Sequence, residues 1–173
     1  MKTLFDFRQA SAAEGWRGIN DTVMGGVSRG SMTAATGTAI FAGVLSLENN
    51  GGFASVRSEP ADFQLAGATG LELRLRGDGK RYKLCVRQDA NFDGVLYQST
   101  FDTHAGKWTN VRVRLGDMVA TYHGRVLKKE PAVDPKRIKT VGLMIADRQP
   151  GDFRLEIESI TALGPDSATS EKR

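Results

Sequence analysis

Two neighbouring segments of the chain alternate apolar and polar residues with a period of two. In residues 71–76, three leucines alternate with Glu and Arg, and in residues 81–87, Tyr, Leu and Val alternate with Arg, Lys and Cys. Strict alternation is the pattern of a β-strand that buries one face and leaves the other in water. Because Gly77-Asp78-Gly79 between the segments is typical of a tight reversal, they are predicted to form a β-hairpin.

Eight further short segments are rich in β-branched and aromatic residues and have no helical period. Turn residues separate them about every eight to twelve positions, as in β-sandwiches and barrels. The chain is therefore predicted to be all-β, an antiparallel β-sandwich or jelly roll. These segments are residues 3–7, 28–34, 38–47, 53–57, 95–101, 108–115, 139–146 and 153–160.

The remaining stretches are predicted to be turns and loops. Residues 28–34 and 38–47 flank Gly37 and are expected to form a hairpin. Residues 117–137 contain prolines and glycine without clear alternation, which favours a long ordered loop with a short helical turn at residues 134–137.

Length and composition favour one soluble domain. A chain of 173 residues is long enough to bury about two thirds of its unfolded surface. Residues 1–163 are expected to form a single sandwich, and residues 164–173 a polar, disordered tail. The net charge of +4 is too small and too dispersed to indicate nucleic-acid binding.

The N-terminus and the cysteine content indicate a reducing compartment. Asp6 and Arg8 interrupt the first apolar residues, so no signal peptide is expected, and strand-like sequence from Thr3 leaves no room for an Arg-rich mitochondrial leader. Cys85 is the single cysteine, which excludes an internal disulfide. A cytoplasmic protein without direct membrane insertion is expected.

Candidate catalytic groups are sparse. His104 and His123 fall on different predicted loops, with no second ligand at metal-binding spacing, so neither a metal site nor a cofactor is expected. No nucleophile stands in a diagnostic motif, and the prediction is that the protein is not an enzyme. Cys85 lies near Lys83 and Arg87, which could activate its thiol, although a lone strand cysteine is more often a small packing residue. The tryptophans Trp16 and Trp108 neighbour apolar strand residues and are expected in the core.

Residues 19–32, here called the 19–32 loop, fit neither a helix nor a strand. Glycines that tolerate positive φ and side chains that bond to nearby backbone predict a shaped loop, which is structural or binds a partner. A phosphate-binding loop is excluded because no Gly-Lys-Ser/Thr ending opens a helix. The residues expected to set its shape or contacts are Asn20, Asp21, Met24, Gly25, Gly26, Ser28 and Arg29.

Basic residues occupy the non-core positions of several central strands. If those strands share a sheet, the residues form one face that could receive an acidic partner; a solvated outer face is the equally weighted alternative. The residues of this predicted basic face are Arg74, Arg76, Lys83, Arg87, Arg112 and Arg114.

An ordered set of motifs from Phe5 to about Ile160 resembles the complex I intermediate-associated protein 30 family. The most specific run is Asp21-Thr22-Val23-Met24-Gly25-Gly26-Val27-Ser28. The other motifs are Trp16, Phe41-Ala42-Gly43, Glu48-Asn49-Asn50-Gly51-Gly52-Phe53, Arg76-Gly77-Asp78-Gly79, Trp108 and Asp147-Arg148-Gln149-Pro150-Gly151-Asp152-Phe153.

The resemblance implies a galactose-binding-like β-sandwich and a non-catalytic role. Members of the family act as assembly factors, in mitochondria for respiratory complex I and in related proteins for other membrane complexes. The protein is therefore expected to be an assembly factor or scaffold that binds a protein partner and no nucleic acid. The alternative is a module of the same fold that binds a small ligand or carbohydrate over the concave face of a sheet.

Overall fold

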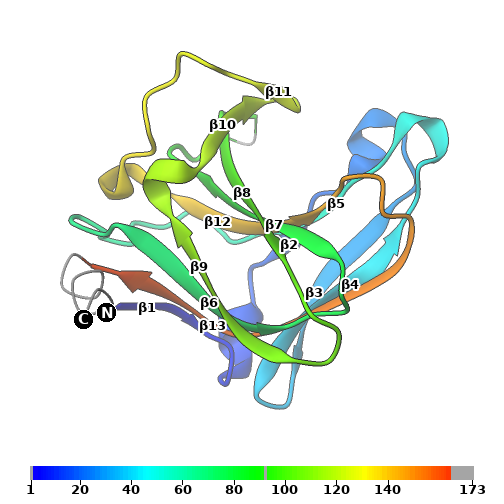
Figure 1. Ribbon diagram of the computed structural model, residues 1–173, viewed down its shortest axis with the longest axis horizontal. Helices are drawn as coiled ribbons and strands as arrows, with labels where there is room; N and C mark the ends of the chain where they lie inside the picture. The colour runs from blue at the N-terminus through cyan, green and yellow to red at the C-terminus, as the bar shows by residue number, and fades with distance from the viewer. Residues whose placement is uncertain (1, 92, 165–173) are drawn as a thin grey trace.

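The computed structural model describes residues 2–91 and 93–164, which form two antiparallel β-sheets packed face to face (Figure 1). Sheet A contains the strands β1 (Lys2–Asp6), β3 (Arg29–Ala35), β4 (Thr38–Leu45), β6 (Gly70–Arg76), β9 (Trp108–Arg114) and β13 (Gly151–Leu163). Sheet B contains the strands β2 (Arg17–Gly18), β5 (Ala54–Arg57), β7 (Arg81–Arg87), β8 (Leu96–Asp102), β10 (Val119–Tyr122), β11 (Arg125–Val126) and β12 (Thr140–Ile145).

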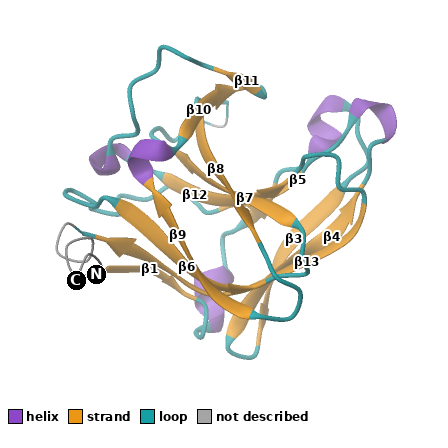
Figure 2. Cartoon of the chain, in the orientation of Figure 1, coloured by secondary structure: helices purple, strands orange, loops and turns teal. Residues whose placement is uncertain are grey.

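The strand orders place early and late parts of the chain side by side. Sheet A runs β3-β4-β13-β6-β9, with β1 paired to the end of β13, and sheet B runs β11-β10-β8-β7-β12-β5-β2. Short 3₁₀ helices connect the strands, and no α-helix occurs among the described residues (Figure 2). The 3₁₀ helices are η1 (Ala10–Ala13), η2 (Asp21–Met24), η3 (Glu48–Asn50), η4 (Leu115–Asp117) and η5 (Pro135–Arg137). None of them has the length or apolar composition needed to cross a lipid bilayer.

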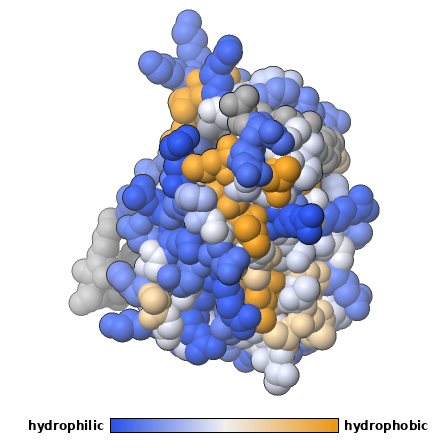
Figure 3. All heavy atoms as spheres, turned by 90° about the vertical axis from the view of Figure 1, so that its right-hand side faces the viewer, coloured by the Kyte–Doolittle hydropathy of each residue, from blue (hydrophilic) through white to orange (hydrophobic). Residues whose placement is uncertain are grey.

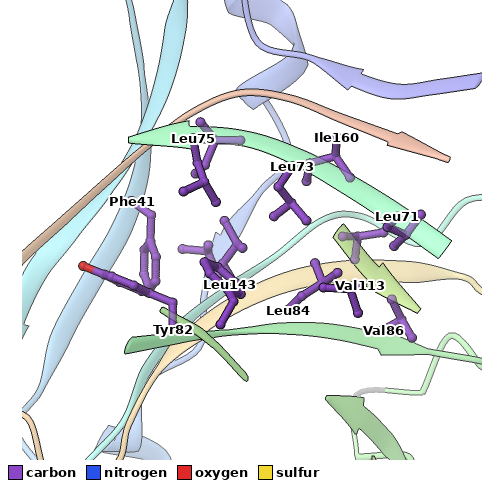
Figure 4. Packing of buried hydrophobic residues seen from close by; sticks show 14 of the residues in the cluster. Phe41, Leu71, Leu73, Leu75, Tyr82, Leu84, Val86, Val113, Leu143 and Ile160 are labelled. Carbon is purple, nitrogen blue, oxygen red and sulfur yellow. The ribbon is translucent and has the colours of Figure 1, made fainter. Parts of the chain in front are cut away.

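The core lies between the sheets, where the alternating residues of β6 and β7 meet. The leucines of β6 point toward β7, whose apolar side chains point back (Figure 4). Each side chain of this size contributes about 1.5–3 kcal/mol when fully buried. The six residues, all fully buried, are Leu71, Leu73, Leu75, Tyr82, Leu84 and Val86.

The predicted hairpin between residues 71–76 and 81–87 is wrong, although both strands are present. β6 pairs with β13 and β9, whereas β7 pairs with β8 and β12, so residues 77–80 carry the chain from one sheet to the other. Asp78 stabilises this crossing because its carboxylate accepts hydrogen bonds from the Tyr82 hydroxyl (3.0 Å) and the Arg154 backbone N–H (2.8 Å). The strands therefore face each other across the core instead of lying side by side.

The predicted fold class, an antiparallel β-sandwich, is confirmed. All ten predicted strands are present, and the hairpin around Gly37 joins β3 to β4. The prediction of one long loop at residues 117–137 is wrong, because this stretch contains β10, which pairs with β8, and β11. Its helical turn is present as η5, whose first turn is capped by Asp134 accepting from the Lys136 backbone N–H. Of the predicted tail, residues 164–173, all but Gly164 lie outside the described residues.

Candidate functional site

A groove of about 830 Å³ lies on the outer face of sheet B, the face turned away from the core. Its floor comes from the outward residues of β5, β7, β8 and β12. One wall comes from residues 51–53, after η3, and the opposite wall from residues 93–94 and the turn after β10. In Figure 2, η2 and η3 lie on one side of sheet B, and β10 and β11 lie on the other.

Strand register produces a low point in the middle of the floor. A cross-strand row joins Gln98 of β8, Cys85 of β7, Gly142 of β12 and Arg57 of β5. Since Gly142 has no side chain, the space between Cys85 and Arg57 stays open. A Cβ at Gly142 would lie 2.7 Å from the backbone oxygen of Val56, so the close strand spacing itself requires glycine there.

Cations line the groove and are partly removed from water. Lys83 is only 13% exposed and lies 3.5 Å from Asp147. Burial, together with the nearby charge of Arg87, lowers the pKa of Arg57 to about 10. Burial likewise lowers the pKa of Arg87, whose Nε is buried with no hydrogen-bond partner among the described atoms. The groove is therefore positively charged at its centre.

Cys85 lies on the groove floor but is only 5% exposed. Burial raises the pKa of its thiol to about 12, although Arg87, Lys83 and Arg57 act in the opposite direction. The thiol is neutral at physiological pH, which favours the packing interpretation over the reactive one.

The 19–32 loop is held together around the fully buried carboxylate of Asp21. Its oxygens accept hydrogen bonds from the Ser28 N–H (2.9 Å) and hydroxyl (2.5 Å), and from the backbone N–H groups of Gly52 (2.7 Å) and Phe53 (3.4 Å). Burial raises the pKa of Asp21, but the bonds from Ser28, Gly52 and Phe53 outweigh it and lower the pKa overall. Because Gly52 and Phe53 line the groove, Asp21 anchors the groove wall from behind.

Two glycines of the loop have different roles. Gly25 ends η2 with φ of +88°, a left-handed conformation, whereas Gly26 packs so closely that a Cβ would lie 2.4 Å from Cγ of Asp21. The sequence predicts that both glycines can adopt a positive φ, but of the two only Gly25 does so.

The other predicted loop residues lie around this centre. Asn20 accepts a hydrogen bond from the Ser55 N–H (3.2 Å), which ties the loop to β5. Arg29 begins β3 and is exposed, and Met24 ends η2. The loop supports the groove without lining it, except through Ile19.

The predicted single basic face is wrong, because its residues lie on opposite sides of the sandwich. Only Lys83 and Arg87 line the groove, on β7 of sheet B. The remaining four, Arg74, Arg76, Arg112 and Arg114, alternate with the core residues of β6 and β9 and so belong to the outer face of sheet A.

Acidic residues interleave with the arginines on sheet A. Arg76 lies 3.0 Å from Glu156, Arg112 lies 2.7 Å from Glu72, and Arg74 lies 3.5 Å from Glu158. Such exposed pairs each contribute about 0–1 kcal/mol. The outer face of sheet A is thus of mixed charge.

The two tryptophans differ in position. Trp16 is in the core, as predicted, at 8% exposure. Trp108 is not, because it occupies an outward position of β9, where the guanidinium groups of Arg76 and Arg74 lie 5.0 and 5.6 Å from its ring centroid. The alternation in β9 puts Val111 and Val113 inward, and hence Trp108 outward.

Several groove residues were missed in the sequence. The missed residues lie on β8 and β12, which flank β7 in the folded sheet, and on β5, the strand beyond β12. They are Gln98 of β8, Gly142 and Met144 of β12, and Arg57 of β5. Only Arg57 could have been predicted from the sequence. It stands two residues after Ser55 in a short predicted strand, so both side chains point to the same, outer face.

Neither histidine lies in a cluster of metal ligands. His123 lies 2.5 Å from Asp93 and stacks on Tyr122 at the rim of the groove, and His104 is exposed. Within residues 2–91 and 93–164, no group of three His, Cys, Asp or Glu side chains could hold a metal ion.

Exposed apolar side chains lie in two regions, one on β10 and β11 and one where the 19–32 loop joins β3 and β4. Val27 and Val44 are 43% and 46% exposed, just before β3 and in β4. Figure 3, which shows the side carrying η2, η3 and β3, has a band of hydrophobic atoms bordered by hydrophilic side chains. Apolar bands with polar borders are typical of contact surfaces.

Solved structures with a similar fold include carbohydrate-binding modules. The family 11 module of a cellulosomal cellulase from Clostridium thermocellum matches with a TM-score of 0.74 over 94% of each chain, at 12% identity. A family 29 carbohydrate-binding module matches with a TM-score of 0.55 over 94% of this chain and 88% of that one, at 11% identity. At identities this low, the similarity shows the fold alone, a galactose-binding-like β-sandwich.

Sequence relatives give the family. A probable mitochondrial complex I intermediate-associated protein 30 from Caenorhabditis elegans is 31% identical over 94 residues, which cover 52% of this chain and 28% of that protein. The mitochondrial protein of that name from Mus musculus is 29% identical over 105 residues, 58% of this chain and 32% of that protein. The aligned region thus spans about a third or less of these relatives. Because the family model matches residues 5–157, the chain belongs to the complex I intermediate-associated protein 30 family.

Proposed function

We propose that this protein is a non-catalytic assembly factor or scaffold that helps to build a membrane-associated, complex I-like protein complex. It binds a protein component of that complex through the groove on sheet B. The observation that carries the proposal is the groove itself, about 830 Å³ in volume and lined by half-buried cations, an amide and apolar side chains, in a member of this family.

The lining of the groove suits a segment of polypeptide. Apolar side chains such as Leu47, Phe53, Leu96 and Met144 supply area for burial. The amide of Gln98 and the cations supply specific polar contacts. The 19–32 loop serves this site as a support, because Asp21 fixes the backbone of Gly52 and Phe53 in the wall.

Site-specific photocrosslinking in the native cell tests the docking site. A benzophenone amino acid replaces Gln98 or Met144 in the groove and, as the control, exposed Asn110 on the outer face of sheet A. We expect crosslinks from the groove positions to a subunit of a membrane complex, and not from position 110. Crosslinks to such a subunit from position 110 alone would place the docking surface on sheet A and contradict the proposal.

A second candidate function is a carbohydrate-binding module. The TM-score of 0.74 with the family 11 module, together with a groove on a sheet face, favours it. Phe53 would then stack on a sugar ring. A glycan array in which the wild-type protein binds a saccharide and Phe53→Ala does not would support this function, whereas binding to no glycan would remove it.

Non-catalytic action and a cytoplasmic location are parts of the same proposal. Substrate turnover that a single polar substitution abolishes would contradict the first. Fractionation of the native cell, with the full protein recovered in a membrane or secreted fraction, would contradict the second.

A further inference from the structure

The backbone is strained where the segment after β12 borders the groove. Among residues 2–91 and 93–164, five non-glycine residues have a positive φ, and three of them, His123, Asp147 and Arg148, line the groove. Histidine and aspartate are found in this left-handed region more often than arginine. Arg148, with φ of +54°, is therefore the most strained of the three. Because such strain gathers at functional sites, the conformation of Arg148 points to a role in the groove.

The side-chain amide of Gln149 enforces this conformation. Its Oε1 accepts a hydrogen bond from the Arg81 backbone N–H (2.9 Å), and its Nε2 donates to the carbonyl oxygens of Arg81 (2.8 Å) and Ala146 (2.9 Å). The amide thus takes the place of a strand backbone opposite Arg81, beyond the last register pair of β12 and β7. Residues 147–148 connect Ala146 to this anchored side chain through two successive left-handed residues.

Arg148 differs from the other arginines and the lysine of the groove in its partners. Lys83 lies 3.5 Å from Asp147, and Nη1 of Arg87 donates to a backbone carbonyl of the wall (2.5 Å). Arg57 also interacts within the chain. Arg148 makes no hydrogen bond or ion pair with the residues that the structure describes. Its guanidinium group is therefore available to a ligand in the groove.

The charge of Arg148 is not balanced by its neighbour in the chain. The carboxylate of Asp147 pairs with Lys83 instead, so these two charges offset each other. Arg148 is exposed at the groove wall, and an anion can reach it without breaking an ion pair or losing much hydration. A charge beside the low-dielectric wall of a groove also attracts a ligand of opposite sign more strongly than one on a flat surface.

We propose that Arg148 determines the specificity of the groove by pairing with the carboxylate of an Asp or Glu side chain on the docked partner segment. The inference rests on the docking function proposed above and adds the chemistry that the partner must carry. Guanidinium and carboxylate groups match in geometry, since each presents a planar pair of bonding atoms. Apolar residues beside the acidic one contact Met144 on the groove floor.

The test measures strain and binding in the same variants. Arg148→Gly removes the guanidinium group together with the backbone strain, whereas Arg148→Gln removes the charge alone. The matched control is Arg114→Gln, at an exposed position on the outer face of sheet A. Binding to the full chain is measured by fluorescence polarisation with two pools of fluorescent eight-residue peptides, random except for a central Glu or a central Gln. Thermal unfolding gives the melting temperature of each variant.

We expect the wild-type protein to bind the Glu pool about tenfold more tightly than the Gln pool. Arg148→Gly and Arg148→Gln should both remove this preference, and Arg114→Gln should retain it. Arg148→Gly should nevertheless raise the melting temperature by about 2–4 °C, because glycine adopts this φ without strain. Loss of binding together with a gain in stability is the result expected of a residue whose strain serves recognition.

Four results would overturn the inference. A Glu preference that survives in Arg148→Gly, or that is lost equally in Arg114→Gln, would show that Arg148 does not select the ligand. A lower melting temperature of Arg148→Gly would show that the arginine serves the fold. Equal binding of the two pools by the wild-type protein would leave peptide docking intact and remove the carboxylate preference. Binding of neither pool would overturn the docking of an extended segment as well.

Discussion

The carboxylate of Asp21 accepts two hydrogen bonds from Ser28, one from its backbone N–H at 2.9 Å and one from its hydroxyl at 2.5 Å. The same hydroxyl accepts from the backbone N–H of Ser46 (2.9 Å), and the second carboxylate oxygen accepts from Gly52 (2.7 Å). The buried carboxylate of Asp21 thus joins the 19–32 loop to the groove wall, and the Ser28 hydroxyl that it holds links the loop to Ser46, just after β4. The charge of the carboxylate is balanced by N–H and O–H dipoles.

Replacing Asp21 with Asn should reduce the free energy of unfolding by about 2–3 kcal/mol. The amide keeps the size of the side chain but substitutes a donor for one acceptor oxygen, and every group around it is a donor. Urea unfolding followed by circular dichroism measures the change. The matched control is Asp117→Asn at an exposed position, with an expected change within about 0.5 kcal/mol. Equal stabilities of the two variants would contradict a structural role for Asp21.

The contribution of Asp21 should depend on pH with a definite sign. Because its pKa is lower in the folded protein than in the unfolded chain, its ionised form stabilises the fold. That stabilisation is complete above the unfolded value of about 3.9 and is lost as the pH falls through the folded pKa. The difference in unfolding free energy between wild type and Asp21→Asn should be constant from about pH 6 upward and shrink in acid. A difference that grows in acid would show the opposite pKa shift.

Gly26→Ala should destabilise the protein more than Gly25→Ala. A Cβ at position 26 would overlap Asp21, and the strain should cost about 2–3 kcal/mol. A Cβ at position 25 would have no neighbouring atom within 4 Å, so alanine there is destabilised only by the left-handed backbone conformation, by about 1 kcal/mol. The β-branched side chain of valine should be destabilised more. Gly116→Ala, equally open and without positive φ, is the control. Thermal unfolding ranks the variants, and the reverse order for positions 25 and 26 would contradict the packing shown here.

Cys85 should react slowly with iodoacetamide in the native protein. Its pKa of about 12 keeps the thiol neutral at pH 8, and burial blocks access. We expect alkylation at least about a hundredfold slower than in the urea-unfolded chain, measured by mass spectrometry at matched pH. Native and unfolded rates of the same size would show that the groove floor opens readily.

Local patterns were sufficient for most of the strands. The alternation in residues 71–76 and 81–87 correctly gave β6 and β7 and their buried faces, because burial of one face imposes a period of two on any strand. β10 was missed because Val119-Ala120-Thr121-Tyr122 is too short to show a period, and its pairing with β8 forms only in the folded chain.

The groove could be predicted only in part. Lys83 and Arg87 were recognised as outward residues, but Arg57 and Gly142 reach them only because β7, β12 and β5 become neighbours. β5 and β12 are separated by about 80 residues of chain, and no local pattern encodes which strands pair.

The sequence by itself determined the family, the all-β class and the side of each main strand that faces the core. The tertiary structure decided which strands share a sheet. Leu75 and Tyr82 show the reason. The alternation of apolar and polar residues predicts that both side chains are buried. Both would be buried equally well if their strands were neighbours in one sheet or if the strands faced each other across the core. The crossing fixed by Asp78 selects the second arrangement, and this choice sends Arg74 and Lys83 to opposite faces of the molecule.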